Sequence, residues 1–529
     1  MLEDANLLTI YEASKWASDH LKREISPQNI NYLVQYGQIK HVDHNGSTHV
    51  YVSDLKRYYV NSIESKRDEW KLQLGSDINW DLSFEGVKER DRTKHVHRFH
   101  PYKGKFIPQL VEYFLDDHID DFKKVSYFQK GDIILDPFCG SGTTLVQANE
   151  LGINAVGIDI SEFNSLISNV KIGNHNNLTL ANELNRITIS IKKFIHQHNW
   201  QNFDNKLLEK LSKFNHQYFP SPEYRYKVRQ GEINQYKYAK QYEDDFHNIF
   251  SELVNEYNLN IHQDNKNDTF LDKWYLDPVR KEIDYIKKLV DEINDPDTRD
   301  VVNIILSRTI RSCRATTHAD LATLKEPVTS TYYCRKHYKI CKPIFSILGW
   351  WERYSEDTLV RLYKFSNLKT NTFQYCITND SRVVDITGEL EKYCSELADL
   401  VMTKKINGIF TSPPYIGLID YHEQHAYAYD IFNFVRRDEL EIGPLYRGKG
   451  VDARKSYVEG IAKVFINCKK YLTQDSNIFI VANDKFKVYP KIAEIAELEI
   501  INKFRRPVLH RTEKDKSAYA ETIFHMKPK

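Results

Sequence analysis

The residues most able to do chemistry lie in two short segments that are far apart in the chain. The first is the run Asp-Pro-Phe-Cys-Gly-Ser-Gly-Thr-Thr at residues 136–144. Its glycines let the backbone approach a bound molecule closely, with a helix expected just beyond. A phosphate-binding loop would carry a lysine after the glycines, where this chain has Thr143 and Thr144. Asp159 ends the next apolar run, where a carboxylate accepts hydrogen bonds from ribose hydroxyls. The pattern indicates a bound adenosine without a pyrophosphate.

The second segment is the tetrapeptide Ser412, Pro413, Pro414 and Tyr415. Two prolines fix φ at about −65° and donate no N–H, so the carbonyls beside them can face a pocket. The exocyclic amine of a nucleobase is a poor nucleophile because its lone pair is delocalised into the ring. Acceptors at the Ser412 hydroxyl and the Pro413 carbonyl would hold the two N–H bonds and favour a pyramidal nitrogen. Tyr415 would stack on a base that has left the duplex.

With these motifs, and with His-Pro-Tyr-Lys-Gly-Lys-Phe-Ile-Pro at residues 100–108, the chain resembles the S-adenosylmethionine-dependent amino DNA methyltransferases of bacteria, of the SPPY type. The resemblance covers about residues 95–171 and 370–527. It implies S-adenosylmethionine as the cofactor and no metal in the reaction. It places catalysis on the tetrapeptide at 412–415. The cofactor contacts that it implies are Lys103, Pro108, Asp136, Phe138, Cys139, Gly140, Gly142, Thr143, Asp159, Ile160 and Asp380.

The resemblance also bears on the substrate. Serine at the first tetrapeptide position is more often found with cytosine N4 methylation, and Asp or Asn with adenine N6 methylation. We therefore expect transfer to cytosine N4 in double-stranded DNA with a flipped base, in a restriction-modification system with a cognate endonuclease. Adenine N6 is the alternative, followed by RNA or protein glutamine as substrate and by a non-catalytic DNA-binding regulator. Carbon-5 methylation is excluded because the cysteine nucleophile of that chemistry typically follows proline, and no Pro-Cys dipeptide occurs.

Composition limits the class of protein. The 529 residues predict two or three domains, and 74 Lys and Arg against 73 Asp and Glu leave no overall positive field, so any attraction to nucleic acid must be local. No apolar run approaches the length of a membrane span, and the amino terminus lacks a signal pattern. We expect no membrane association and a location in the bacterial cytoplasm. Seven scattered cysteines predict reduced thiols.

Apolar runs predict the elements that must position the two segments. Strands are expected at 131–135, 155–158, 374–378, 408–410, 478–481 and 522–525, with helices after the glycine run and after Ser161. This pattern predicts an α/β fold: a Rossmann-like methyltransferase sheet with helices on both faces, a helical insert and an amino-terminal winged-helix module. The expected divisions are the module at 1–62, a linker at 63–94, a cofactor-binding part of the core at 95–171, the insert at 172–375 and a catalytic part at 376–529.

The insert is the expected DNA target-recognition region. Its clearest helices are predicted at 277–293, capped by Asp277, and at 299–311, with residues 294–297 separating them. Within it, residues 301–350 hold eight Lys or Arg against two Asp or Glu, a local excess that favours contact with DNA. Trp350 and Trp351 are predicted to lie in the core.

Residues 1–62 predict a helix at 10–21 with a capping box between Thr9 and Glu12, a helix from Pro27, a hairpin turning at Gly46 and a helix from Asp54. This order resembles winged helix-turn-helix modules of the excisionase or MerR-like type. Such a module would place residues 28, 29, 31 and 32 at a duplex. Docking on the main domain or on another copy is the alternative.

Two further groups of residues stay open. Residues 421–425 follow the tetrapeptide closely enough to line a base pocket. Cys313, His318, Cys334, His337 and Cys341 have spacings that permit a tetrahedral zinc site. Basic residues at 335, 336, 339 and 342 equally suit a helix that contacts DNA phosphates, and we prefer that interpretation.

Overall fold

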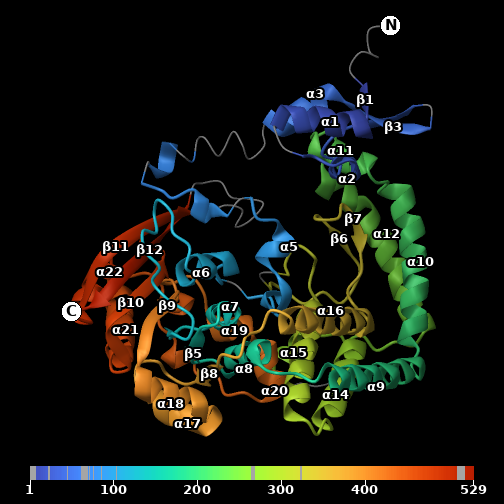
Figure 1. Cartoon of the computed structure of the whole chain (residues 1–529). Coiled ribbons are helices and arrows are strands. Elements are labelled where there is room, and N and C mark those ends of the chain that lie inside the picture. The colour runs from blue at the N-terminus through green and yellow to red at the C-terminus, as the bar shows by residue number, and fades with distance from the viewer. Residues whose placement is uncertain are drawn as a thin grey trace.

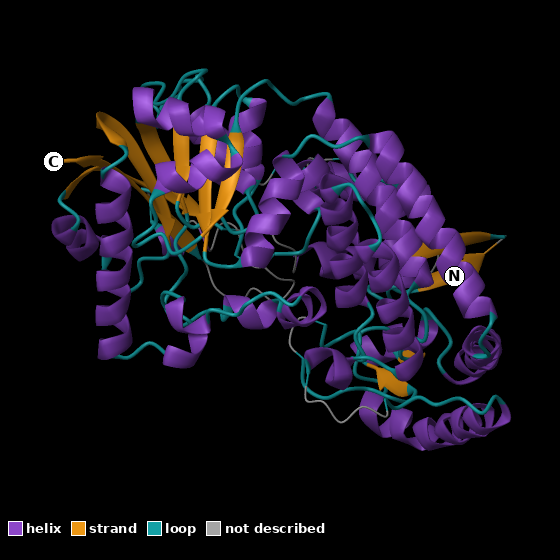
Figure 2. Cartoon of the chain, turned by 90° about the horizontal axis from the view of Figure 1, so that it is seen from below, coloured by secondary structure: helices purple, strands orange, loops and turns teal. Residues whose placement is uncertain are grey.

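The computed structural model describes residues 7–21, 24–44, 46–60, 70, 72–75, 77–84, 86–102, 104–263, 269–321, 324–508 and 519–529. Figure 1 shows a sheet with its helices at one side, a helical region at the other, and a small amino-terminal unit above the helical region. Figure 2, seen from below, shows the same separation of sheet and helices.

The central sheet has seven strands in the order β11-β12-β10-β9-β4-β5-β8. β12 is antiparallel to both its neighbours, and the remaining pairs are parallel. This is the Rossmann-like α/β fold that the sequence predicts, and each of the six expected strands is present. Within this sheet, β11 is the strand that the sequence pattern does not predict. The strands are β4 (Ile133–Asp136), β5 (Asn154–Asp159), β8 (Gln374–Thr378), β9 (Ile406–Thr411), β10 (Leu472–Ala482), β11 (Leu498–Pro507) and β12 (Ala520–Pro528).

Both faces of the sheet are buried, so its central strands are continuous apolar runs rather than alternating ones. Along β4, Ile134 packs in one hydrophobic core, and Ile133 and Leu135 pack in the other. The first core lies under α6 (Pro108–Leu115), α7 (Thr143–Glu150) and α8 (Glu162–Ile172). The second lies under α17 (Ile386–Tyr393), α18 (Ser395–Lys404), α21 (Val451–Lys469) and α22 (Tyr489–Ile495).

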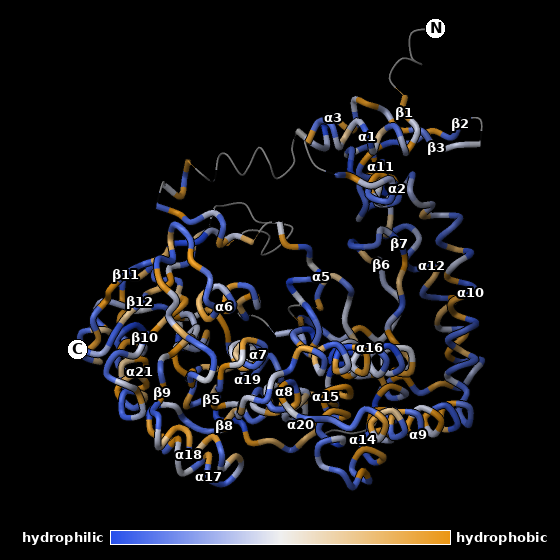
Figure 3. Tube along the Cα trace, in the orientation of Figure 1, coloured by the Kyte–Doolittle hydropathy of each residue, from blue (hydrophilic) through white to orange (hydrophobic). Residues whose placement is uncertain are grey.

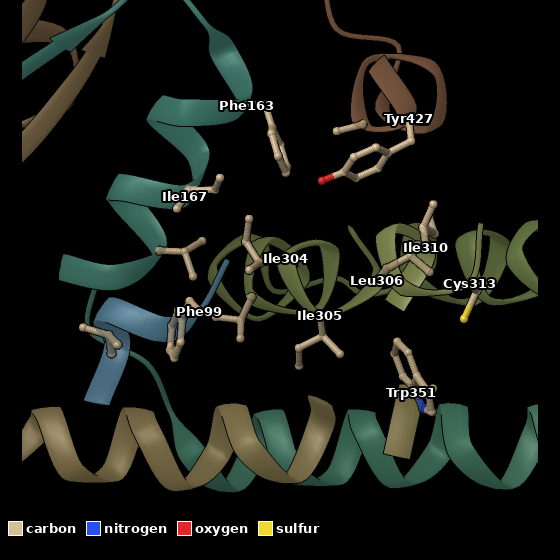
Figure 4. Close-up of a cluster of buried hydrophobic side chains, with 14 of the residues drawn as sticks. Phe99, Phe163, Ile167, Ile304, Ile305, Leu306, Ile310, Cys313, Trp351 and Tyr427 are labelled. Atoms are coloured by element: carbon tan, nitrogen blue, oxygen red, sulfur yellow. The ribbon is translucent and has the colours of Figure 1, made fainter. Parts of the chain in front are cut away.

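A long helical region separates β5 from β8 in the sequence. Figure 4 shows Ile304, Ile305 and Leu306 of α15 in a buried cluster with Phe163 of α8 and Trp351 of α16. The helical region therefore shares a continuous core with one face of the sheet. Its elements are α9 (Asn177–His196), α10 (Trp200–Tyr218), α11 (Glu223–Arg229), α12 (Gln235–Glu256), α13 (Phe270–Trp274), α14 (Asp277–Asp291), α15 (Pro296–Ser312), β6 (Tyr332–Cys334), β7 (Lys339–Cys341) and α16 (Leu348–Ser366).

Helix α10 illustrates how the outer helices of this region attach. Its buried residues Trp200, Phe203, Leu207 and Leu211 recur every three or four positions, which places them on one face of the helix. Figure 3 shows hydrophilic and hydrophobic residues mixed along α10, as expected for a helix with one face exposed to solvent.

The expected limits of α14 and α15 differ from the structure at three points. The residue that caps α14 is Leu276, while Asp277 lies in the first turn and the helix ends at Asp291. α15 begins at Pro296, inside the stretch expected to separate the helices, because the Asp295 side chain accepts a hydrogen bond from the Thr298 N–H at 3.0 Å. Proline is tolerated there since the first-turn N–H has no partner within the helix.

The amino-terminal unit has a small hydrophobic core of its own. The elements follow the order expected from the sequence, with the addition of a short first strand that was not expected. In the capping box, the Glu12 carboxylate accepts the Thr9 N–H at 2.9 Å, and the Thr9 hydroxyl accepts the Glu12 N–H at 3.2 Å. The assignment as a winged helix remains a prediction. The elements are β1 (Leu7–Thr9), α1 (Ile10–Leu21), α2 (Pro27–Gln35), β2 (His41–His44), β3 (Ser47–Tyr51) and α3 (Val52–Val60).

This unit docks on α11 of the helical region. Arg225 and Arg229 donate to the backbone carbonyls of Gln35 and Tyr36, at 3.2 and 3.1 Å. Gly37 follows with φ +63°, and a Cβ there would stand 2.7 Å from the backbone nitrogen of Tyr226. The end of α2 is therefore occupied by the helical region, while residues 28, 29, 31 and 32 remain exposed.

In the described part of the chain, none of the helices is both long enough and apolar enough to cross a membrane.

The close approach at Gly37 predicts a difference between two glycine substitutions. Gly46 has a similar φ of +75°, but a Cβ there meets nothing within 4 Å in the described structure. Gly46→Ala should cost only the left-handed backbone penalty of about 1–2 kcal/mol. Gly37→Ala should cost about 1–3 kcal/mol more because of the clash with α11. Urea unfolding of both variants measures the difference, and equal costs would show that the contact with α11 is not tight.

Candidate active site

The sheet brings the two chemically suggestive segments together. β4 leads into the glycine run and β9 leads into the tetrapeptide, and these strands are parallel neighbours that pair Leu135 with Ile409. The carboxyl ends of parallel strands meet at one edge of a sheet, where loops form binding crevices. Residues 136–144 and 412–415 therefore lie at the same edge, although about 270 residues separate them in the sequence.

A cavity opens at this edge, with about 890 Å³ of empty space including its mouth. The wall includes residues from the glycine run, from the end of β5, from the loop after β8 and from the tetrapeptide. The predicted site residues that line it are Phe138, Cys139, Gly140, Thr143, Asp159, Ile160, Asp380, Ser412 and Pro414.

Of the other six predicted site residues, five lie outside this lining and one lies outside the described residues. Pro108 is buried at the start of α6, and Gly142 precedes α7 with φ +70°, where a Cβ would stand 2.9 Å from the Ser168 hydroxyl. Asp136 and Pro413 are buried, and Tyr415 is half-buried. Lys103 lies outside the described residues.

Asp136 lies beneath the cavity and links its two sides. The hydroxyls of Thr144 and Thr411 each donate to its carboxylate at 2.6 Å, and the Phe138 N–H donates at 3.2 Å. Thr144 belongs to α7 and Thr411 ends β9, so one carboxylate joins the glycine run to the strand that carries the tetrapeptide. Burial raises the pKa of Asp136 to about 6, although these hydrogen bonds oppose the shift.

Asp159 faces the cavity from the end of β5. Its carboxylate accepts hydrogen bonds from the backbone N–H of Gly140 at 2.8 Å, the N–H of Ser161 at 2.9 Å and the Asn164 amide at 3.1 Å. Removal from water raises its pKa to about 6. The hydrogen bond to Gly140 fixes the carboxylate against the glycine run.

Two buried polar atoms around the cavity have no hydrogen-bond partner among the described residues: the Ser141 hydroxyl and the carbonyl oxygen of the Asn164 amide. Buried polar atoms are normally paired, so these two fit contact with a polar ligand. The Tyr102 ring lies over Gly140, where a Cβ would come within 3.1 Å of it. A Cβ there would require the ring to shift, and the φ of +53° at Gly140 also favours glycine.

Asp380 lines the cavity from the loop after β8. Arg382 binds its carboxylate through two nitrogens, at 2.9 and 2.7 Å. The Ser381 hydroxyl donates to the Pro137 carbonyl at 2.7 Å, which ties this loop to the glycine run. The structure thus brings Asp380 to the cavity despite the long insertion before β8.

The tetrapeptide is anchored at three points. The Ser412 hydroxyl donates to the Val481 carbonyl at 3.0 Å, and the Tyr415 hydroxyl donates to Glu521 at 2.8 Å. The Tyr457 hydroxyl donates to the Pro414 carbonyl at 2.9 Å. Among the described residues, no hydrogen bond reaches the Pro413 carbonyl. The tetrapeptide is therefore held rigidly, and its Pro413 carbonyl stays available to accept a hydrogen bond.

Part of the cavity wall carries no sequence motif. Glu441 lines it and is buried, and it accepts the His422 N–H at 2.8 Å. No motif marks Glu441, which reaches the site from a loop far along the chain. Of the candidates at 421–425, Tyr421 lines the cavity and His422 is buried behind it. Glu423, Gln424 and His425 line a second, larger cleft instead.

The second cleft adjoins the cavity and shares Tyr102 and Lys105 with it. Its empty space is about 2340 Å³ including the open mouth. Lys105 and five arginines outnumber its three acidic residues, Asp357, Asp420 and Glu423. The arginines are Arg98, Arg308, Arg311, Arg314 and Arg353.

Ion pairing distinguishes these arginines. Arg308 is paired with Asp357 at 2.7 Å. Among the described residues, Arg98 and Arg311 have no carboxylate partner, so their charge is available to a ligand. Trp350, which was expected in the core, is half-buried and lines the cleft, whereas Trp351 is fully buried as expected.

Comparisons with known proteins bear on this site. The sequence profile of the DNA methylase family matches residues 38–170. The type II methyltransferase M.MjaII of Methanocaldococcus jannaschii is 44% identical over 98% of this chain and 97% of its own length. The type II methyltransferase M.BsoBI of Geobacillus stearothermophilus is 42% identical over 14% of this chain and 13% of its own. The type II methyltransferase M.MvaI of Kocuria varians is 30% identical over 19% of this chain and 20% of its own length.

The raised pKa of Asp136 predicts a pH dependence of stability. Because its pKa lies at about 6 in the folded state against an ordinary 3.8, the folded protein binds more protons across that interval. Wild type should lose roughly 2 kcal/mol of stability relative to Asp136→Asn as the pH rises from about 4 to about 6. Urea unfolding of both proteins at the two ends of the interval measures this change. A constant difference would contradict the shifted pKa.

Proposed function

Because this chain belongs to the amino DNA methyltransferases, which methylate DNA at specific sites with S-adenosylmethionine as donor, we propose that it methylates N4 of cytosine in double-stranded DNA. The observation that carries the proposal is the cavity whose wall contains both the glycine run and Ser412. A methyl donor and an amine that meet in one cavity can react directly.

The residues of the cavity fit the donor. S-adenosylmethionine, when bound, supplies an electrophilic methyl carbon on a sulfonium sulfur. Asp159 would accept hydrogen bonds from its ribose hydroxyls, and the glycine run would let the backbone approach it. The unpaired Ser141 hydroxyl and Asn164 carbonyl oxygen offer further polar contacts. Asp380, on the loop tied to Pro137, would accept a hydrogen bond from the adenine amine.

The tetrapeptide would hold the amine that receives the methyl group. A serine hydroxyl has one hydrogen to donate and two lone pairs to accept with. The hydrogen of Ser412 is committed to the Val481 carbonyl, so the lone pairs remain for an N–H of the substrate. The Pro413 carbonyl accepts the second N–H. Two acceptors draw the hydrogens out of the plane of the base and free the nitrogen lone pair.

The reaction then needs little else from the protein. With the donor bound, the nitrogen lone pair would form a bond to the methyl carbon as the carbon–sulfur bond breaks and its electrons return to sulfur. The positive charge passes to nitrogen, where the acceptors on Ser412 and Pro413 stabilise it. A proton leaves the amine afterwards, so no strong base is required. The products are the methylated base and S-adenosylhomocysteine.

Tyr415 would stack on the target base, which must leave the duplex to reach the cavity. Its hydroxyl is anchored by Glu521, which also accepts from Arg506 at 2.9 Å. The ring position is therefore fixed before the base arrives. We prefer cytosine over adenine because the tetrapeptide begins with serine, and adenine N6 is the alternative.

The basic cleft would hold the duplex. It borders the cavity along Tyr102 and Lys105, so a base flipped out of a duplex in the cleft has a short path to Ser412. Free arginine charge at Arg98 and Arg311 suits phosphate contacts, which dominate affinity for DNA. The exposed residues of α2 would extend the contact, and a cognate restriction endonuclease would complete the system.

The first test identifies the product base and the role of the tetrapeptide. Labelled methyl transfer to DNA, followed by digestion to nucleosides, should yield N4-methylcytosine. Ser412→Ala should lower kcat by about 10- to 150-fold, because it removes a hydrogen bond worth about 1.5–3 kcal/mol to a developing charge. Binding of S-adenosylmethionine, measured by calorimetry, should change little.

Tyr415→Ala and Tyr415→Phe are a matched pair in the same assay. The phenylalanine keeps the stacking ring and loses only the hydrogen bond to Glu521, so it should keep most of the activity that alanine loses. If digestion of the methylated DNA yields N6-methyladenine instead of N4-methylcytosine, the target base is adenine and not cytosine. Full activity of Ser412→Ala would remove the tetrapeptide from the mechanism.

The second test concerns the basic cleft. Arg98→Ala and Arg311→Ala should each weaken DNA binding across sequences and reduce the slope of log K against log salt by about one. Lys288→Ala is the control, because that exposed lysine lies on α14 and does not line the cleft. Fluorescence anisotropy at several salt concentrations measures the slopes. Slopes equal to that of wild type would show that DNA binds elsewhere.

A further inference from the structure

Four of the five cysteine and histidine residues that the sequence groups together meet in the helical region, away from the active-site cavity. Each of His318, Cys334, His337 and Cys341 offers a ligand atom, and these four atoms lie within 4.8 Å of one another. Cys313 does not join them, because it is buried in the main core at the end of α15. The two cysteines are buried and the two histidines are half-buried.

The distances fit a tetrahedral ion. The Sγ atom of Cys341 lies 3.6 Å from Nδ1 of His337, and the Sγ atom of Cys334 lies 3.9 Å from Nδ1 of His318. Zinc bonds of about 2.3 Å to sulfur and about 2.0 Å to nitrogen place neighbouring tetrahedral ligands about 3.3–3.8 Å apart. Only small side-chain movements separate this arrangement from a complete coordination sphere.

The backbone presents the four ligands on one face of a hairpin. β6 and β7 pair Tyr333 with Ile340 and Cys334 with Lys339, so the two cysteines are diagonal neighbours on the same face. His337 lies in the connecting turn, beside Tyr338 with φ +56°. His318 comes from a preceding loop, where its backbone N–H donates to the Tyr332 hydroxyl at 3.2 Å. The helix expected for the basic residues at 335–342 is wrong, because these residues lie in or directly after the hairpin of β6 and β7.

The two faces of the hairpin are stabilised unequally. On one face, Ile340 and Tyr333 pack on the main core, and Asn215 of α10 exchanges two hydrogen bonds of 2.9 Å with the Ile340 backbone. On the other face, the hydrophobic cluster consists of Tyr332, Cys334 and Cys341, with Val328 beside it. Strands of three residues with so small a cluster are marginal in water. A metal ion would supply the missing stability.

We propose that His318, Cys334, His337 and Cys341 bind one zinc ion. Four protein ligands with two thiolates and two imidazoles close the coordination sphere, as in structural rather than catalytic zinc sites. Mixed sulfur and nitrogen donors in a tetrahedron select zinc over magnesium or calcium, which prefer oxygen. The Tyr332 hydroxyl, 2.8 Å from Nδ1 of His318, either holds that ring from outside the coordination sphere or gives way to the ion.

A disulfide between the two cysteines fits less well. Diagonal cross-strand neighbours have Cα atoms about 7–8 Å apart, whereas disulfides require about 4.4–6.8 Å. Phosphate contact is disfavoured for two of the four basic residues nearby, because carboxylates already engage them. Lys342 is paired with Asp204 at 2.5 Å, and Arg335 approaches Asp320 at 3.4 Å.

The site lies where the amino-terminal unit docks. Arg225 donates to the His337 carbonyl at 3.1 Å and to the Gln35 carbonyl at 3.2 Å, so one guanidinium joins the hairpin to the end of α2. Arg229 lies over the Tyr338 ring at 5.4 Å and donates to the Tyr36 carbonyl. An ion that holds the hairpin would therefore also hold the surface on which the amino-terminal unit rests.

The test measures metal content in the full chain, purified without added chelator and with any affinity tag removed. Plasma mass spectrometry should find one zinc per chain. The double variant Cys334→Ser with Cys341→Ser should retain almost none. Cys394→Ser is the control, because Cys394 is a free, half-buried cysteine outside the cluster, and it should retain the full amount.

Two further measurements do not depend on the stability of the double variant. Cobalt exchanged into the wild-type protein should give the intense visible bands of a tetrahedral site with thiolate ligands. His318→Cys supplies another zinc ligand and should keep the metal, whereas His318→Ala should bind it far more weakly. A merely structural histidine would not show this rescue.

The proposal fails if the wild-type chain contains no zinc after incubation with zinc under reducing conditions, or if the double variant and the control retain equal amounts. It also fails if thiol titration of the unfolded, metal-free chain finds two fewer reactive thiols than the seven cysteines, because that result indicates a disulfide. None of these readouts requires methyl transfer, so the outcome is independent of the proposed function.

Discussion

The site depends on the parallel pairing of β4 with β9. Because these strands are neighbours, the glycine run and the tetrapeptide leave the sheet at the same edge. The buried carboxylate of Asp136 reinforces the pairing, since it binds a hydroxyl from α7 and a hydroxyl from the end of β9. Burying this carboxylate away from water costs free energy, and the two short hydrogen bonds offset part of that cost.

The rest of the molecule is arranged around that edge. The long helical region enters the chain between β5 and β8, yet it returns β8 beside β5 and brings Asp380 to the cavity. Helices α15 and α16 share a core with α8 and carry several of the arginines of the basic cleft. The basic cleft adjoins the cavity because the helices that carry several of its arginines and the helix that follows the glycine run pack on the same hydrophobic core.

The sequence predicted the sheet well where strands are buried on both faces, because continuous apolar runs mark them. It missed β11, where exposed and buried residues mix. It predicted the motifs of the cavity but not Glu441, which reaches the site through tertiary packing alone. The start of α15 differs from the expected one because Asp295, inside the stretch expected to separate the two helices, caps α15 and Pro296 occupies its first turn. The roles of the individual site residues remain predictions.

The most direct measurement is a crystal structure of the chain with S-adenosylhomocysteine, the product of methyl transfer. The account predicts that the ribose hydroxyls contact Asp159 and that the sulfur faces Ser412 across the shared cavity. Binding of the nucleoside elsewhere, or a sulfur that points away from the tetrapeptide, would contradict it.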